Sequence, residues 1–227
     1  MKVQYINHMG DDLSVVNSAR VSFGKKSDWE TTTNHLPSSA AHKILSDRDC
    51  KLIKYLAEHQ HKSPFNHAFA TFHVKAPIFV ARQLQKHEYM PWNEISRRYV
   101  DSEPEFYEPD VWRGRSADKK QGSEGVIDSS DLDHELSMLD DAYSDIKAIY
   151  KSITDPKWGI NVAPEQARMV LPQSMYTEWY WSGSLYAFAK MCSLRLKEDT
   201  QLETQVIAKQ ISLEMETLFP VSWRALV

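Results

Sequence analysis

Residues 82–99, RQLQKHEYMPWNEISRRY, are the part of the chain richest in side chains that could bind a ligand or transfer a group. Cations crowded into so short a segment repel one another unless an anion lies between them, and arginine and lysine commonly bind phosphate. The amides, the serine and the carboxylates between them can read the edge of a heterocycle. The segment therefore indicates a pocket for a small phosphorylated ligand that carries a base, with a solvated charged surface as the plain alternative. The residues concerned are Arg82, Gln83, Gln85, Lys86, His87, Glu88, Asn93, Glu94, Ser96, Arg97 and Arg98.

Two more arginines lie among apolar residues, Arg168 in QARMVLP and Arg195 in CSLRL. A charge flanked by core residues must meet a counter-charge or a ligand, because an unpaired buried charge is very costly. One interpretation is a buried ion pair at each position. The other is that both guanidinium groups reach the anionic ligand that Arg98 also binds.

Other kinds of site find little support in the sequence. The histidines at 59, 61, 67, 73 and 87 do not have the spacing of HExxH or of a Cys/His finger, so no metal is expected. Cys50 and Cys192 make no disulfide framework, and Cys192 in AFAKMCSLRL reads as a buried structural thiol rather than a nucleophile. The motifs GxSxG, GxGxxG and GxxxxGK[ST] do not occur.

The composition favours a cytoplasmic globular protein. A chain of 227 residues with 42% hydrophobic residues can form one domain over 1–227, with polar loops expected at about 25–43 and 114–131. The net charge of −4 argues against general nucleic-acid binding, and no apolar run or signal-like start indicates a membrane partner. The aromatic and basic stretch 176–195 leaves single-strand nucleic-acid binding as a weaker alternative to core packing.

The elements that must position the active side chains follow from periodicity. Period-two alternation predicts strands at 2–6 and 65–75. Helices are expected where apolar residues recur at three- and four-residue steps, where proline can begin a helix, or where capping boxes occur. The expected helices cover 11–20, 46–60, a segment begun by Pro77, 132–153, a segment from Pro164 broken near Pro172, 173–195, and a last helix with a capping box Thr200-x-x-Glu203 that ends before Pro220.

Several segments, taken in order, resemble the flavin-dependent thymidylate synthase family. They are GDDLSVVNSARVSF at 10–23, HKSPFNHAFATFHVKAPIFVARQ at 61–83, NEISRRY at 93–99, ARMVLP at 167–172 and LR at 194–195. The resemblance covers nearly the whole chain apart from the two polar loops. It implies an α+β fold with a twisted, mainly antiparallel sheet packed with long helices, and a homotetramer with active sites shared between subunits.

The resemblance also implies an activity. The family makes dTMP from dUMP, with methylene-tetrahydrofolate as the one-carbon donor and FAD reduced by NADPH, and it uses no cysteine nucleophile. By matching positions, the expected catalytic residues are Arg195, which would stabilise negative charge developing on the uracil, and Ser96. Substrate binding is expected of Gln83, Gln85, Lys86, Glu94, Ser96, Arg97, Arg98, Arg168 and Arg195. Flavin binding is expected of Ser22, His61, Ser63, Lys86, His87, Glu88, Tyr89, Glu94, Ser184, Tyr186 and Lys190.

The chain departs from the family pattern mainly where it should contact the flavin. Lys86-His87-Glu88 replaces the family's RHR, Pro91 replaces a serine, and Ser184, Tyr186 and Lys190 replace Asn, Arg and Asn. Lys190 could restore the charge lost at residue 88, and Tyr186 could stack on a ring. These departures keep two alternatives open: a hydroxymethylase of dUMP or dCMP on the same scaffold, and a nucleotide-binding module without catalysis.

Overall fold

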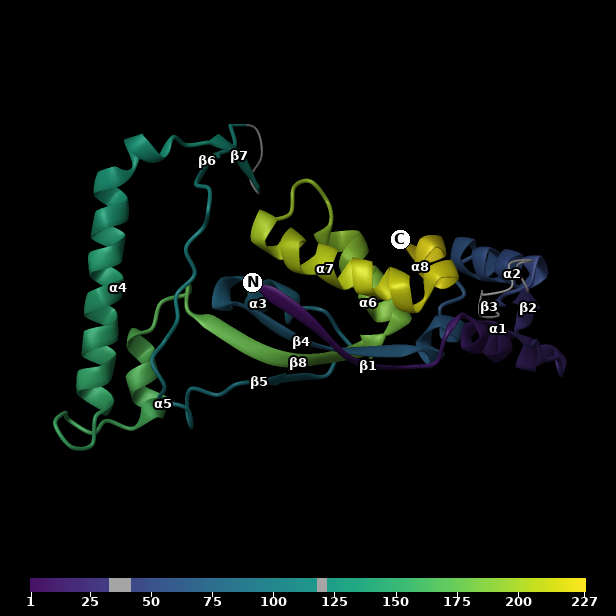
Figure 1. Ribbon diagram of the computed structural model, residues 1–227, viewed down its shortest axis with the longest axis horizontal. Helices are drawn as coiled ribbons and strands as arrows, with labels where there is room; N and C mark the ends of the chain where they lie inside the picture. Colours follow the sequence, from purple (N-terminus) through teal and green to yellow (C-terminus); the bar gives the residue numbers. More distant parts are fainter. Residues whose placement is uncertain (33–41, 118–121) are drawn as a thin grey trace, which may run out of the picture.

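An antiparallel four-stranded sheet organises the protein, a computed structural model of which describes residues 1–32, 42–117 and 122–227. The order across the sheet is β1-β4-β8-β5, so strands distant in the sequence become neighbours (Figure 1). Strand β5 pairs with β8 by aligning Trp92 with Trp181 and Glu94 with Trp179. The strands are β1 (Lys2–Met9), β4 (Phe69–Pro77), β8 (Tyr176–Ser184) and β5 (Trp92–Glu94).

Helices cover one face of this sheet. Helices α3 (Ile78–Leu84), α6 (Leu185–Arg195) and α7 (Leu202–Leu218) lie on that face (Figure 1). Between them and the sheet, Phe188 meets Phe72 and Trp181 edge-on, with ring centroids 5.2 and 5.5 Å apart. The apolar sides of the strands are thereby buried, which is the main stabilising term for such a layer.

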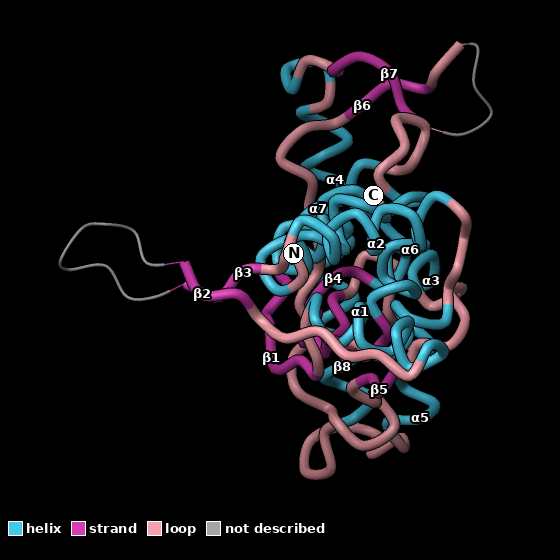
Figure 2. The backbone as a smooth tube through the Cα atoms, turned by 90° about the vertical axis from the view of Figure 1, so that its right-hand side faces the viewer, coloured by secondary structure: helices cyan, strands magenta, loops and turns pink. Residues whose placement is uncertain are grey.

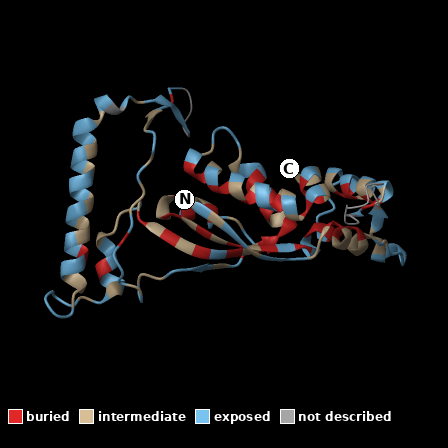
Figure 3. Ribbon diagram, in the orientation of Figure 1, coloured by how far each residue is buried: buried red, intermediate tan, exposed pale blue. Residues whose placement is uncertain are grey.

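The remaining elements lie at the two ends of the sheet. Helices α1, α2 and α8 pack together at one end, and the long α4 stands away from the sheet at the other, beside the short α5 (Figure 1). Figure 3 shows that α4 is mostly exposed, and Tyr150 is its only buried residue among those described. These helices are α1 (Asp12–Arg20), α2 (Asp47–Glu58), α4 (Asp133–Thr154), α5 (Pro164–Ala167) and α8 (Pro220–Leu226).

Two short hairpins project from the body (Figure 2). One pairs β2 (Glu30–Thr32) with β3 (His42–Ile44), and the other pairs β6 (Arg113–Arg115) with β7 (Ser123–Val126). The predicted polar loops at 25–43 and 114–131 therefore contain strands at their edges; their parts at 33–41 and 118–121 lie outside the described residues. Four 3-10 turns complete the described elements: η1 (Val21–Phe23), η2 (Ser63–His67), η3 (Ser129–Asp131) and η4 (Arg168–Val170).

The fold class and most helices are confirmed. Helices occupy the segments predicted at 11–20, 46–60 and 132–153, and α3 begins directly after Pro77. Ser46 caps α2, accepting a hydrogen bond from the backbone N–H of Asp49 at 3.2 Å. Helix α7 ends at Leu218, before Pro220, and the helix from Pro164 is short.

Three predictions of secondary structure were wrong. The strand expected at 65–75 begins only at Phe69, because residues 63–67 form the turn η2. The helix expected over 173–195 is strand β8 followed by α6, because the residues of 176–184 alternate between the two faces of the sheet. The capping box at residue 200 does not form, because α7 begins at Leu202 with Gln201 as its N-cap, and the Thr200 hydroxyl donates to the carbonyl oxygen of Leu194. The Glu203 carboxylate accepts from Arg113.

Candidate active site

The segment 82–99 is divided between different cavities by the fold. Its first part completes α3 and continues beyond it. The buried residues Val80, Ala81 and Leu84 anchor this helix against α7 and the sheet. The second part of the segment forms β5 at the sheet edge and a turn after it. Residues 86–88 and 96–98, ten positions apart in the sequence, therefore line different cavities.

One cavity, of about 520 Å³, collects the second part of the segment together with η4. We call it the arginine cavity, because Arg97, Arg98 and Arg168 line it beside Glu94 and Ser96. The hydroxyl oxygen of Ser96 accepts hydrogen bonds from the backbone N–H and the Nε of Arg98, each at 3.3 Å. Arg168 is exposed and donates from Nε to the carbonyl oxygen of Glu165 at 3.2 Å. This concentration of guanidinium groups suits a phosphate.

Glu94 is held at the edge of the arginine cavity by two donors. Its Oε1 accepts from the hydroxyl of Thr177 at 2.6 Å, and its Oε2 accepts from the indole N–H of Trp92 at 3.1 Å. The Trp92 ring stacks on Trp179, with centroids 4.2 Å apart. The carboxylate is thus fixed in orientation by the sheet before any ligand binds.

A second cavity, of about 750 Å³, collects most of the residues expected at the flavin, whereas Glu94 lines the arginine cavity. We call it the histidine cavity; it is lined by Lys62, Asn66, Lys86, His87, Glu88, Tyr89, Ser184, Tyr186, Lys190 and Arg195, among others. Lys190 and Glu88 both line this cavity, so the positive charge of Lys190 lies in the same cavity as the carboxylate of Glu88. The hydroxyl of Ser184 donates to Asn66 at 2.6 Å and accepts from the backbone N–H of Ala187, which caps α6.

Two hydrogen bonds orient Arg195, which lines the histidine cavity. Its Nε donates to Nε2 of His87 at 3.1 Å, and its Nη2 donates to the carbonyl oxygen of Gln83 at 2.7 Å. Burial, with the nearby charges of Arg195 and Lys190, lowers the pKa of His87 to about 4. His87 is therefore neutral near pH 7 and can accept this hydrogen bond.

Gln83 and Arg195 also line a third cavity, of about 660 Å³, at the start of α7. The side-chain amide of Gln83 donates to Gln201 and accepts from the hydroxyl of Thr204 at 3.1 Å. Both ends of the amide are thus occupied by residues of the α7 start. Sequence analysis missed this pairing, because nothing local in the sequence joins residues 83 and 204.

A fourth cavity, of about 780 Å³, lies between α1, α2 and η2. We call it the α2 cavity; the expected flavin residues Ser22, His61 and Ser63 line it. They are separate from the expected flavin residues of the histidine cavity. Neighbouring residues of the same segment divide between the two: His61 and Ser63 line the α2 cavity, whereas Lys62 and Asn66 line the histidine cavity.

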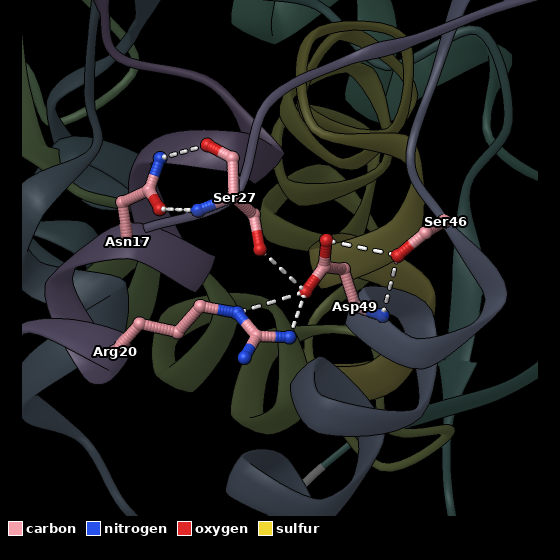
Figure 4. Close-up of polar contacts among 5 residues, drawn as sticks. All are labelled: Asn17, Arg20, Ser27, Ser46 and Asp49. Carbon is pink, nitrogen blue, oxygen red and sulfur yellow. Dashed lines mark hydrogen bonds and ion pairs between the residues drawn. The ribbon is translucent and has the colours of Figure 1, made fainter. Parts of the chain in front are cut away.

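Arg20, which lines the α2 cavity, forms a buried ion pair with Asp49 (Figure 4). Arg20 donates to Asp49 from Nε at 3.0 Å and also from Nη2. Asp49 accepts further hydrogen bonds from the hydroxyls of Ser27 and Ser46, at 3.0 and 2.9 Å. Burial would raise the pKa of Asp49, but these hydrogen bonds, that of Arg20 first, lower it overall. The segment that carries Ser22 is thereby tied to α2.

The predicted site residues are thus gathered in part. Arg98 and Arg168 share one cavity, whereas Arg195 lines two others, so the three guanidinium groups do not converge within one chain. Gln85 is exposed and lines none of the four cavities. Within the described residues neither Arg168 nor Arg195 pairs with a carboxylate, so an ion pair does not explain them.

A second buried ion pair was not anticipated from the sequence. Arg113 of β6 donates to Glu203 of α7 at 2.6 Å, and the hydroxyl of Tyr107 lies 3.5 Å from the same oxygen. Burial and then Glu203 raise the pKa of Tyr107 to about 12. Arg113 also lines the third cavity, so this pair fixes one of its walls. Nothing local in the sequence joins Arg113 to Glu203.

The structure also bears on the other kinds of site. Cys192 is buried, its pKa is raised by burial to about 12, and it cannot supply a thiolate nucleophile near neutral pH. The described residues contain no group of three His, Cys, Asp or Glu placed to hold a metal ion. Trp179 and Trp181 are core residues, which favours packing over nucleic-acid binding for 176–195. Among the helices described, none combines the length and the apolar character needed to cross a bilayer.

Comparison with known proteins gives a family match over nearly the whole chain. A family model described as thymidylate synthase complementing protein matches residues 4–221. The flavin-dependent thymidylate synthase of Thermus thermophilus is 37% identical over 224 residues, 98% of this chain and 74% of that protein. The enzyme of the same name from Pseudothermotoga lettingae is 33% identical over 225 residues, 99% of this chain and 89% of that protein.

A solved structure shares the fold. The UMP/dUMP methylase PolB from Streptomyces cacaoi, bound with 5-Br UMP, has a TM-score of 0.79 and 28% sequence identity, covering 99% of this chain and 92% of that one. The same methylase bound with 5-Br dUMP has a TM-score of 0.78 at 28% identity, covering 99% of this chain and 93% of that one. The chain belongs to the flavin-dependent thymidylate synthase family.

Proposed function

We propose that the protein makes dTMP from dUMP, with methylene-tetrahydrofolate as the one-carbon donor and FAD reduced by NADPH. The observation that carries the proposal is that side chains scattered between residues 86 and 195 gather into two cavities, each lined by groups that suit one of the expected ligands. The arginine cavity offers guanidinium groups and a serine for a nucleotide phosphate. The histidine cavity offers lysines, an aromatic ring and a neutral histidine for a larger anionic ring compound.

We propose that dUMP binds with its phosphate in the arginine cavity. Arg98 and Arg168 would neutralise it, and Ser96, whose oxygen already accepts from Arg98, would donate its own O–H. The fixed carboxylate of Glu94 would meet a donor of the sugar or base. Arg97, a further cation of this cavity, donates to the carbonyl of Ser102 and would add to the positive field.

Arg195 would reach this dUMP only from another copy of the chain. Within one chain it lines different cavities from Arg98 and Arg168, although all three are expected at the nucleotide. A homotetramer with shared active sites would supply Arg195, Gln83 and Lys86 from the neighbouring subunit. Arg195 would then face the uracil, with its guanidinium already oriented by His87.

The residues of the histidine cavity fit a flavin. Lys62, Lys86 and Lys190 outnumber the single carboxylate of Glu88 among its lining residues, which suits a pyrophosphate. Tyr186, already under the Lys62 ammonium at 5.6 Å, offers a ring face for stacking. When bound, the flavin would carry the reducing equivalents from NADPH that convert the transferred carbon to methyl. The chain would hold it through Lys86, Tyr186 and Lys190, and His87 would stay neutral beside it.

The alternatives are less well supported. A hydroxymethylase is not favoured, because the two solved structures compared above are of a protein named a methylase. A module without catalysis is disfavoured by the relatives, which are named as synthases.

The absorption spectrum of the purified protein, followed by product analysis, tests the proposal. We expect a flavin band that dUMP perturbs and that NADPH bleaches without oxygen. Incubation with dUMP and methylene-tetrahydrofolate should give dTMP only when NADPH is present. A colourless protein that binds dUMP but does not take up added FAD would support a binding module instead, and a hydroxymethyl product formed without NADPH would support the hydroxymethylase.

A further inference from the structure

The side-chain amide of Gln83 is held in one of its two orientations. Its nitrogen donates to the side-chain oxygen of Gln201, and its oxygen accepts from the Thr204 hydroxyl at 3.1 Å. Gln83 belongs to α3 and both partners belong to the start of α7, and these two helices are in contact (Figure 1). An amide turned over would place its oxygen against the oxygen of Gln201, so the pairing opposes the other orientation.

A charged group favours the matching orientation of Gln201. The carboxylate of Glu203 accepts from Arg113 at 2.6 Å. Burial would raise the pKa of Glu203, but hydrogen bonds, that of Arg113 first and that of Gln201 among them, lower it overall. An ionised carboxylate accepts hydrogen bonds and never donates them. It therefore favours the Gln201 orientation that turns the amide nitrogen towards Glu203 and leaves the amide oxygen for Gln83.

The nitrogen end of the Gln83 amide lies on the side of the third cavity. Gln83 and Gln201 both line this cavity, whereas Thr204 is completely buried and does not line it. The bond to Thr204 therefore holds the amide oxygen towards the interior of the protein. An amide nitrogen carries two hydrogens, and the contacts among the described residues use one of them, for Gln201. The second hydrogen is left for an acceptor on a ligand.

Arg195 lines the same cavity beside Gln83. Its Nη2 donates to the backbone carbonyl oxygen of Gln83 at 2.7 Å, so the guanidinium and the amide are neighbours. A guanidinium and an outward amide nitrogen both present donors, and they suit a base edge that carries an acceptor oxygen, such as O4 of uracil. Cytosine has an amino group at that position, whose hydrogens would meet the hydrogen of Gln83.

We propose that Gln201 and Thr204 are positioning residues that hold the Gln83 amide with its nitrogen outwards, and that this orientation makes the site select a uracil nucleotide over a cytosine nucleotide. The inference rests on the proposed function, in which a neighbouring subunit brings Gln83 and Arg195 to the dUMP. Gln83 would donate to O4 of the base. With cytosine, two donors would face each other and both would stay unpaired, which is an effective basis for rejecting the wrong base.

Equilibrium dialysis of the flavin-loaded protein with labelled dUMP and labelled dCMP tests this. We expect the wild type to bind dUMP about tenfold or more tightly than dCMP, because a donor left unpaired is costly. The double variant Gln201→Met, Thr204→Val removes both partners of Gln83 at similar side-chain size, so the amide is free to turn over. Its preference for dUMP should fall by about three- to tenfold, through weaker binding of dUMP and not of dCMP.

Two variants serve as controls. Thr204→Ser keeps the hydroxyl and should keep the wild-type preference. Thr217→Val removes a hydroxyl from an exposed residue of the same helix, where it donates only to the carbonyl oxygen of Leu213, and should also keep the preference. If the double variant does not fold, as judged by circular dichroism, the single variant Thr204→Val should shift the preference in the same direction by a smaller factor.

Two results would overturn the inference. One is equal affinity of the wild type for dUMP and dCMP, and the other is the full wild-type preference in the double variant. In the second case, an equal loss of affinity for both nucleotides would assign Gln83 to the phosphate or the sugar that they share. The proposed function fails separately: a protein that prefers dUMP and loses this preference in the double variant, but forms no dTMP, would contradict the activity and not this inference.

Discussion

Arg195 and His87 are joined by a hydrogen bond in which the guanidinium is the donor and the imidazole the acceptor, at 3.1 Å. Arg195 donates a second hydrogen bond to the carbonyl oxygen of Gln83, which lies shortly before His87 in the chain. The two acceptors fix the plane of the guanidinium, which a single contact could not do. Arg195 is therefore oriented in advance for whatever its free N–H groups meet.

Removing Arg195 should damage turnover far more than flavin binding. We expect Arg195→Ala to lower kcat by about 10²- to 10³-fold, the effect of losing one fixed donor to a developing negative charge. Flavin absorbance per protein should stay close to that of the wild type, because the lysines of the histidine cavity remain. Normal turnover in this variant would show that the assigned role is wrong.

The neutral state of His87 predicts a pH dependence of stability. Its pKa is about 4 in the folded protein and about 6.5 ordinarily, so the unfolded chain binds this proton more readily. The free energy of unfolding should therefore fall as the pH drops from about 6.5 to about 4, by roughly 1–3 kcal/mol once partial exposure is allowed for.

Urea denaturation across that pH range, with His87→Asn beside the wild type, measures the effect. The variant should show a shallower loss of stability on acidification. The matched control is His59→Asn, since His59 is exposed on α2's end and touches neither Arg195 nor Lys190. Equal pH slopes for His87→Asn and the wild type would contradict the prediction.

Arg98 provides a test of the arginine cavity alone. Arg98→Ala should raise the Kd of dUMP by about 10- to 100-fold, as expected for a hydrogen bond to a charged group. Arg82→Ala is the matched control, because Arg82 is exposed in the same segment but lines none of the four cavities. Equilibrium dialysis with labelled dUMP gives both values. If the two variants bound dUMP alike, the phosphate would have to lie elsewhere.

The sequence specified the helices better than it specified the central strand of the site. Residues 176–184 form β8, yet no proline or glycine cluster separates them from α6, so the two elements looked like one aromatic helix. The alternation of buried Thr177, Trp179 and Trp181 was the missed signal. Gly183 also has a packing reason: a Cβ there would lie 3.0 Å from Met90 and 3.2 Å from Phe188.

The grouping of site residues depends on contacts that no local pattern encodes. Gln83, Arg98, Arg168 and Arg195 were recognisable by type and by resemblance. Their distribution among cavities follows from β5 pairing with β8, which places residues 96–98 in a different cavity from Gln83 near the end of α3. In the same way Glu203 has capping-box spacing from Thr200, but α7 begins after Gln201, and Arg113, 90 residues earlier, donates to the Glu203 carboxylate.

Asp49 should be the carboxylate on which the N-terminal end of the molecule most depends. Its side chain is 3% exposed and that of Arg20 is 11% exposed, so removing the negative charge leaves a mostly buried guanidinium without its partner. Because breaking a buried pair on one side costs several kcal/mol, Asp49→Asn should lower the free energy of unfolding by about 2–4 kcal/mol. Asp47→Asn, exposed in the first turn of the same helix, should cost less than about 1 kcal/mol. Urea unfolding monitored by tryptophan fluorescence compares the two variants. Similar losses of unfolding free energy in both would mean that the charge of Asp49 acts only through the helix dipole, and that the ion pair with Arg20 contributes no stability.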